Sequence, residues 1–321
     1  MEKEINTEEL KRAITRTIAF FDMFDFPLTA FEVWKYCGEK CSLFDVEDVL
    51  NKNRPHPSPL LGKERGLIER KNGFYFLKGR KDIIDTRMKR YNIADKKFRR
   101  AIWVSKIFRF IPWIKMIAVG NMIGGNNAKK AGDIDLLIVV EKGRIWITRF
   151  FSVGIIKLFK LRPEKENTQD KICLSFFLSE NNLNTENLCL ENGDNYFTYW
   201  MASLVPIYDQ GNIYRKFIQE NKWFRNKLPN WKSIKTVSGR KTKKIFDNFY
   251  HDIVDIFVGG LDRIFKRIQF KMFPEDLKEI INRDTRVVVS DDILKFHLND
   301  RRENYQIQYK KKLNEIFREN N

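Results

Sequence analysis

Apolar and polar positions along the first 80 residues predict three helices followed by a β-hairpin. Apolar side chains recur with helical spacing in three segments, residues 10–24, 30–37 and 42–51. Thr29 and Glu32 have the spacing of a capping box at the start of the second segment. Two apolar runs, 67–70 and 74–77, then flank an Asn-Gly pair that favours a tight type I′ turn. These residues therefore predict a small domain of helices and strands.

The middle of the chain alternates short apolar runs with helical segments. The pattern predicts strands at 116–120, 133–141 and 171–179, and helices at 144–161, 194–205 and 212–221. Beyond residue 245 it becomes helical, with an amphipathic stripe from Ile253 to Ile268 that Gly259 and Gly260 interrupt. A short extended run is expected at 286–289, and a charged helix at 303–317.

We therefore predict an α+β protein with three parts. Residues 1–80 follow the order helix, helix, helix and hairpin, which is the order of a winged helix. Residues 81–235 would form a small mixed sheet with helices, entered through a basic helix at 78–100. Residues 236–321 would form a C-terminal helical region.

Composition narrows the class of protein. The 321 residues are 43% hydrophobic, which suits a folded chain, and the formal net charge is +18. Four scattered cysteines and three histidines predict neither a disulfide framework nor a zinc site. Arg149 and Lys157 interrupt the longest apolar segment, and the chain opens with charged residues. We therefore expect a cytoplasmic protein without a membrane partner.

The positive charge favours a polyanionic partner such as RNA. One block, residues 222–244, holds nine Lys and Arg and no acid, with Trp223, Phe224 and Trp231 between them. These aromatics could stack on nucleic-acid bases, or they could anchor a solvated basic face to the core. The third predicted helix carries Asp45, so a protein partner suits the N-terminal domain better than DNA does.

The segment 120–140, GNMIGGNNAKKAGDIDLLIVV, carries the candidate chemistry. Side chains alternate along a strand, so Asp133 and Asp135 should point the same way. Two adjacent carboxylates repel each other unless a cation neutralises them, and oxygen ligands suit Mg²⁺. Glycines and backbone amides in the preceding loop could hold phosphates.

This segment resembles the nucleotidyltransferase superfamily that includes DNA polymerase β. The family pattern is a glycine turn, a loop of about ten residues and Asp-x-Asp in a strand, which matches Gly120, Asn121, Asp133 and Asp135. The resemblance implies an enzyme that uses Mg²⁺ or Mn²⁺ to transfer a nucleoside monophosphate from a nucleoside triphosphate to a hydroxyl group. Gly120 and Asn121 would hold phosphates through backbone and amide donors.

Lys129 and Lys130 lie just before the aspartates, where they could meet a triphosphate or belong to a solvated loop. The family also supplies a third carboxylate from a later strand. The matching strand, 171–179, carries no acid on its polar face, and only Asp170 and Glu180 flank it.

Two functions therefore follow from the sequence. One is nucleotidyl transfer to an RNA end, a protein or a small molecule. The other is a catalytically degenerate protein that binds a nucleotide or a nucleic acid and regulates a partner.

Overall fold

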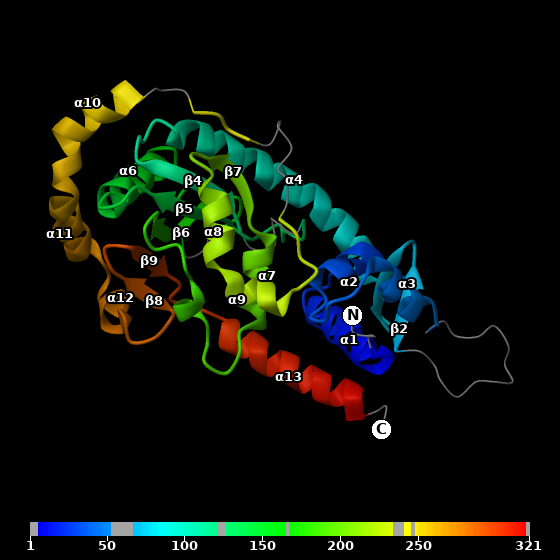
Figure 1. Cartoon of the computed structure of the whole chain (residues 1–321). Helices are drawn as coiled ribbons and strands as arrows, with labels where there is room; N and C mark the ends of the chain where they lie inside the picture. Colours follow the sequence, from blue (N-terminus) through cyan, green and yellow to red (C-terminus); the bar gives the residue numbers. More distant parts are fainter. Residues whose placement is uncertain are drawn as a thin grey trace, which may run out of the picture. The chain divides into compact units, whose positions relative to one another are not determined.

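The computed structural model describes residues 6–52, 67–120, 126–164, 167–233, 241–244 and 248–318. The chain forms two compact units (Figure 1). The first comprises Met1–Tyr91, Trp223–Ser233 and Arg302–Asn321, and the second comprises Asn92–Lys222 and Ile234–Arg301. These units differ from the three predicted parts, because the predicted C-terminal region is divided between them.

The first unit follows the predicted order of elements. These are α1 (Thr7–Asp22), β1 (Leu28–Thr29), α2 (Ala30–Tyr36), α3 (Leu43–Lys52), β2 (Ile68–Lys71) and β3 (Phe74–Leu77). The three strands form an antiparallel sheet in the order β1-β3-β2. Local chemistry sets these boundaries. The capping box of Thr29 and Glu32 starts α2, and Asn72 and Gly73 both have positive φ angles in the β2–β3 turn.

The last helix, α13 (Arg302–Arg318), belongs to the first unit, where it packs on α1. The hydroxyl of Tyr309 donates to the carbonyl of Arg16 over 3.1 Å, and its ring meets Phe20 edge to face. Lys312 forms an ion pair with the buried Asp22. The charged helix predicted at 303–317 is therefore confirmed, while its assignment to a C-terminal region is not.

The second unit contains a six-stranded sheet in the order β7-β4-β5-β6-β9-β8. Its strands are β4 (Ile114–Val119), β5 (Ile134–Val140), β6 (Ile172–Ser179), β7 (Val205–Asp209), β8 (Val287–Val289) and β9 (Ile293–Phe296). Only the β5–β6 pair is parallel. The fold is mixed α+β, as predicted. β8 lies in the extended run expected at 286–289, whereas β9 was not predicted, and both strands extend this sheet, so the region beyond residue 245 is not only helical.

Helices surround the sheet. They are α4 (Ile83–Phe108), which begins in the first unit, α6 (Ile145–Leu158), α7 (Asn195–Ser203), α8 (Ile213–Glu220), α10 (Asn248–Val258), α11 (Asp262–Met272) and α12 (Glu275–Ile280), with 3-10 turns at Glu186–Leu188 and Gly259–Leu261. Short α9 (Lys222–Lys227) belongs to the first unit except for its first residue. Apolar residues of α4 and α6 form one core with alternate residues of β4, β5 and β6. Figure 1 shows α7 and α8 in front of the strands. No helix in the described part of the chain is long and apolar enough to cross a membrane.

Strand β6 departs from simple alternation. Asp135 is paired with Cys173, whereas Leu137 is paired with Phe176, so β6 has one extra residue between these two pairs. Ile172, Leu174 and Phe177 contribute to the core with α4 and α6, while Phe176 stacks on Trp200 of α7. Strict alternation would place Phe176 on the same face as Leu174, and the bulge is the reason that Phe176 lies elsewhere.

Candidate functional site

The two aspartates lie together at the beginning of β5. Asp133 immediately precedes the strand and Asp135 is its second residue, while Ile134 and Leu136 point into the core with α4 and α6. A carboxylate oxygen of each aspartate and the Sγ of Cys173 lie within 4.8 Å of one another. The predicted convergence of Asp133 and Asp135 is therefore present, and the third member of the cluster is a thiol.

Strand register explains why Cys173 is that third member. β5 and β6 run in parallel, and Asp135 is the Cα partner of Cys173. Parallel neighbours with matched parity present their side chains on the same face of the sheet. The sequence offered only Asp170 and Glu180 as a third acidic group near strand 171–179, and Cys173 was not among these candidates.

Neither acid that flanks β6 joins the cluster. Asp170 forms an ion pair with Lys97 over 2.9 Å. Glu180 lies at the other end of the strand, where its N–H donates to the carbonyl of Val140. Val140 is five positions beyond Asp135 in β5, which is about 16 Å along a strand. In the described ranges, the carboxylates of this cluster are therefore Asp133 and Asp135.

Hydrogen bonds link Cys173 to the neighbouring strand. Its thiol donates to the Oγ of Ser175 over 3.2 Å, and that Oγ lies 2.8 Å from Nε2 of His297. The bulge in β6 allows both Ser175 and Phe176 to contact His297. Sequence analysis gave His297 no functional role, because nothing in a single sequence shows that it lies beside Ser175.

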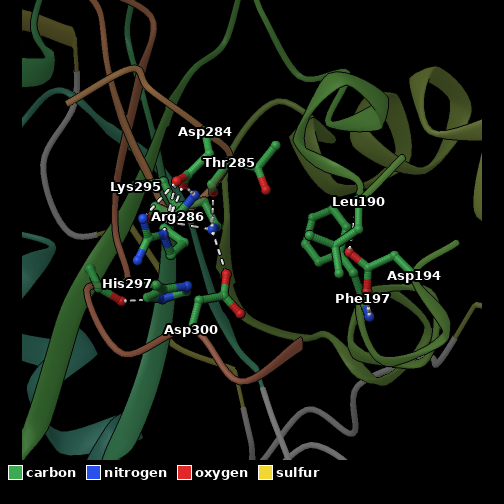
Figure 2. Close-up of polar contacts among 10 residues, drawn as sticks. Leu190, Asp194, Phe197, Asp284, Thr285, Arg286, Lys295, His297 and Asp300 are labelled. Carbon is green, nitrogen blue, oxygen red and sulfur yellow. Dashed lines mark hydrogen bonds and ion pairs between the residues drawn. The ribbon is translucent and has the colours of Figure 1, made fainter. Parts of the chain in front are cut away.

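A buried lysine fixes the segment that carries His297 (Figure 2). Lys295 is 1% exposed and its ammonium donates to the carbonyls of Thr285 and Arg286, with Asp300 at 3.3 Å. The N–H of His297 donates to the carbonyl of Arg286 over 3.0 Å. The imidazole therefore extends from a backbone that is anchored on both sides.

Gly120 has a steric role that differs from the predicted one. Its N–H donates to the carbonyl of Asp135 over 3.0 Å, so this donor belongs to the sheet and is not available to a phosphate. A Cβ atom at this position would lie 2.9 Å from Cζ2 of Trp200. Glycine is required here because the indole of Trp200 packs directly against the backbone.

The helix that carries Trp200 is capped by a buried aspartate. Asp194 accepts hydrogen bonds from the N–H groups of Phe197 and Leu190 at the N-terminus of α7 (Figure 2). Trp200 stacks with Phe197 and Phe176 at ring distances of 5.6 and 5.7 Å. Trp200 is half-buried and thus belongs to an aromatic layer that packs against Gly120.

Lys97 of α4 organises the loop that precedes the aspartates. Its side chain is 1% exposed, and its ammonium donates to the carbonyls of Lys130 and Gly132 in addition to pairing with Asp170. Two backbone carbonyls and a carboxylate thus neutralise a cation that would otherwise be costly to bury. Sequence analysis missed Lys97 because it is one of many cations in a basic helix.

The structure describes only some of the residues that were predicted to contact phosphates. The side chains of Lys129 and Lys130 are exposed, so they are accessible to an anionic ligand. Their carbonyl groups shape the turn, because that of Lys129 accepts from Gly132 and that of Lys130 accepts from Lys97. Asn121 lies outside the described residues.

The electrostatics of the cluster favour an added cation. Burial, together with the neighbouring charge of Asp135, raises the pKa of Asp133 to about 6. Burial also raises the pKa of the Cys173 thiol well above its usual value, and both aspartates add to that shift. Each of these shifts measures the cost of placing another negative charge here, and a divalent cation would remove that cost.

The aromatics of the basic block are buried. Trp223 and Trp231 are 7% and 6% exposed, and Phe224, which packs against both, is fully buried. Their burial supports the alternative that these aromatics anchor a solvated basic face to the core. They are not arranged as an exposed platform for nucleic-acid bases.

Comparison with known proteins gives no further constraint. No protein-family model matches the chain, and no curated protein or solved structure matches it significantly.

Proposed function

We propose that this protein transfers a nucleoside monophosphate from a nucleoside triphosphate to an acceptor hydroxyl group. The observation that carries the proposal is the convergence of Asp133, Asp135 and Cys173 at the beginning of two parallel strands. The spacing of Gly120 and the Asp-x-Asp pair, which resembles the polymerase β superfamily, gives this cluster a reaction class.

The donor set supports a divalent cation. Two carboxylate oxygens suit Mg²⁺ or Mn²⁺, while a thiol is a poor ligand for Mg²⁺. When bound, such a cation would neutralise triphosphate charge and polarise the phosphate under attack. Asp133 and Asp135 would hold it, and Lys97 would keep their loop in place. Lys129 and Lys130 are the exposed cations nearest in sequence that could contact the triphosphate.

The net charge of the chain is the main indication of the acceptor's chemical class. A net charge of +18 favours a polyanionic acceptor such as an RNA end. The first unit would then be a winged helix that binds a protein partner, because the acids of α3 disfavour DNA. This assignment is supported by the order of its elements and its three-stranded sheet.

A second function is favoured by one specific observation. In the part of the chain that the structure describes, no third carboxylate joins the cluster. A domain with this arrangement could bind a nucleotide and a divalent cation and regulate a partner without forming a product.

Calorimetry and a transfer assay separate the two functions. Binding of each ribonucleoside triphosphate would be measured with Mg²⁺ and with Mn²⁺ for the wild type, for D133N/D135N and for D252N, which changes an exposed aspartate elsewhere in the same unit. We expect cation-dependent binding that D133N/D135N abolishes and D252N retains. Labelled triphosphate with mixed RNA then tests transfer. Binding without product supports the regulatory function, and no binding by the wild type rules out both.

A further inference from the structure

Cys173 has three features that suit a metal ligand, and its place beside both aspartates distinguishes it from the other described cysteines. Its Sγ lies within 4.8 Å of a carboxylate oxygen of both Asp133 and Asp135. It is neither fully buried nor part of the core formed with α4 and α6. It also lies on the face of the sheet that carries the polar cluster, next to Ser175.

The spacing of the three donor atoms suits a single ion. Bonds from zinc to oxygen and sulfur are about 2.0–2.3 Å, so tetrahedral donors to one ion lie about 3.3–3.8 Å apart. Small side-chain rotations would bring three atoms that are within 4.8 Å of one another to that separation. Three protein ligands also leave a fourth position for a substrate oxygen or water.

The surroundings of Cys173 hold its sulfur in place. Ser175 lies between Cys173 and His297, with contacts of 3.2 and 2.8 Å. His297 is itself anchored through the carbonyl of Arg286. Groups that orient a metal ligand in this way commonly change metal affinity by about 10–100-fold when they are removed.

We propose that Cys173 is the third protein ligand of the metal site, and that the site therefore prefers a thiophilic divalent cation such as Zn²⁺ to Mg²⁺. The inference rests on the metal site of the proposed function, and it assigns that site its cation. Its physical basis is ligand softness, because a thiolate binds Zn²⁺ strongly whereas Mg²⁺ requires oxygen ligands. A cysteine in place of a third carboxylate would then change which cation the site prefers.

Direct metal binding tests the proposal without any assay of activity. The affinities of the full chain for Zn²⁺ and Mg²⁺ would be measured by competition with a chelating dye, and Co²⁺ would be used as a spectroscopic probe. We expect tighter binding of Zn²⁺ than of Mg²⁺ and a sulfur-to-cobalt charge-transfer band in the near ultraviolet. C173S should lose the charge-transfer band, and its affinity for Zn²⁺ should fall at least 100-fold, while its affinity for Mg²⁺ stays unchanged.

Two further variants sharpen the test. C173D should gain at least tenfold in Mg²⁺ affinity, because it restores three carboxylates, and S175A should weaken Zn²⁺ about tenfold while it keeps the cobalt band. C189S is the matched control, because it changes a half-buried cysteine elsewhere in the second unit. Its metal affinities and cobalt spectrum should equal those of the wild type. Circular dichroism of each metal-free variant would confirm that it is folded.

The possible failures are distinguishable. If the wild type binds Mg²⁺ as tightly as Zn²⁺ and C173S changes neither affinity, the role of Cys173 is overturned while the metal site stands. If a cobalt band persists in C173S, the sulfur ligand is another cysteine and the proposal is also overturned. If no divalent cation binds in a manner that depends on Asp133 and Asp135, both this inference and the proposed function fail.

Discussion

The acidic residues at the two ends of strand β5 have opposite electrostatic surroundings. After its last residue, Glu141 forms an ion pair with Lys115 over 2.7 Å, and its carboxylate lies 2.9 Å from Nε2 of His251. At its beginning, Asp133 makes no ion pair within the described residues, and its pKa is raised to about 6, mainly by burial. The protein supplies a cation, Lys115, for one end itself. The other end retains repulsion that a bound cation could relieve.

The largest expected effect comes from Lys97, which maintains the acidic end without pairing with Asp133. K97M should lower the free energy of unfolding by about 2–4 kcal/mol, because the carbonyls of Lys130 and Gly132 and the carboxylate of Asp170 lose a donor whose side chain is 1% exposed. Urea unfolding followed by tryptophan fluorescence would measure the loss.

The matched control for K97M lies at the other end of the strand. K115M removes a cation whose side chain is 22% exposed, and it should cost less than about 1 kcal/mol. If the two substitutions cost the same, the loop before β5 does not depend on Lys97, and the difference between the two ends of the strand is not one of burial.

The second effect tests the close packing beside the acids. G120A would place a Cβ atom 2.9 Å from the indole of Trp200, so we expect a loss of about 1–3 kcal/mol. G154A in α6 is the control, because an added Cβ there meets nothing within 4 Å. Alanine in a helix interior should stabilise it by about 0.5–1 kcal/mol. Thermal unfolding of both variants would therefore give shifts of opposite sign.

Local signals in the sequence were sufficient for much of the fold. The capping box at Thr29 and the Asn72-Gly73 turn act over a few residues, and both are present as predicted. Alternation alone brought Asp133 and Asp135 together. Each of these features depends on chemistry within one segment, which a single sequence contains in full.

The remaining features depend on pairing between distant segments. The bulge in β6 exists only relative to β5, so strict alternation assigned Phe176 to the wrong face. Lys97 acquires its role from carbonyls of the loop before β5, and His297 acquires its role from Ser175 across the β6–β9 pair. Cys173 was visible in the sequence, but its significance depends on its register with Asp135.

The third effect is a dependence of stability on pH that originates at Asp133. An acid whose pKa is higher in the folded state holds its proton more tightly there, so the contribution of Asp133 to stability is greatest below about pH 4 and declines as the pH rises through about 6. A shift from 3.8 to about 6 corresponds to about 2–3 kcal/mol. D133N should remove this decline and be more stable than the wild type at pH 7. Urea unfolding between pH 4 and 7 would measure it, and a less stable D133N at pH 7 would contradict it.

The smallest effect comes from the opposite end of the strand and should have the opposite sign. E141Q leaves Lys115 and His251 without their carboxylate, yet these side chains are each 22% exposed, so water can replace most of the lost interaction. We therefore expect E141Q to cost about 0.5–1 kcal/mol at pH 7 and less at high salt, since salt screens partly exposed pairs. Unfolding of E141Q and D133N at low and high salt, side by side, would compare the two ends directly. Stabilisation by E141Q would mean that Glu141 is also a strained acid, and the distinction between a neutralised end and a ligand-binding end would then have to be abandoned.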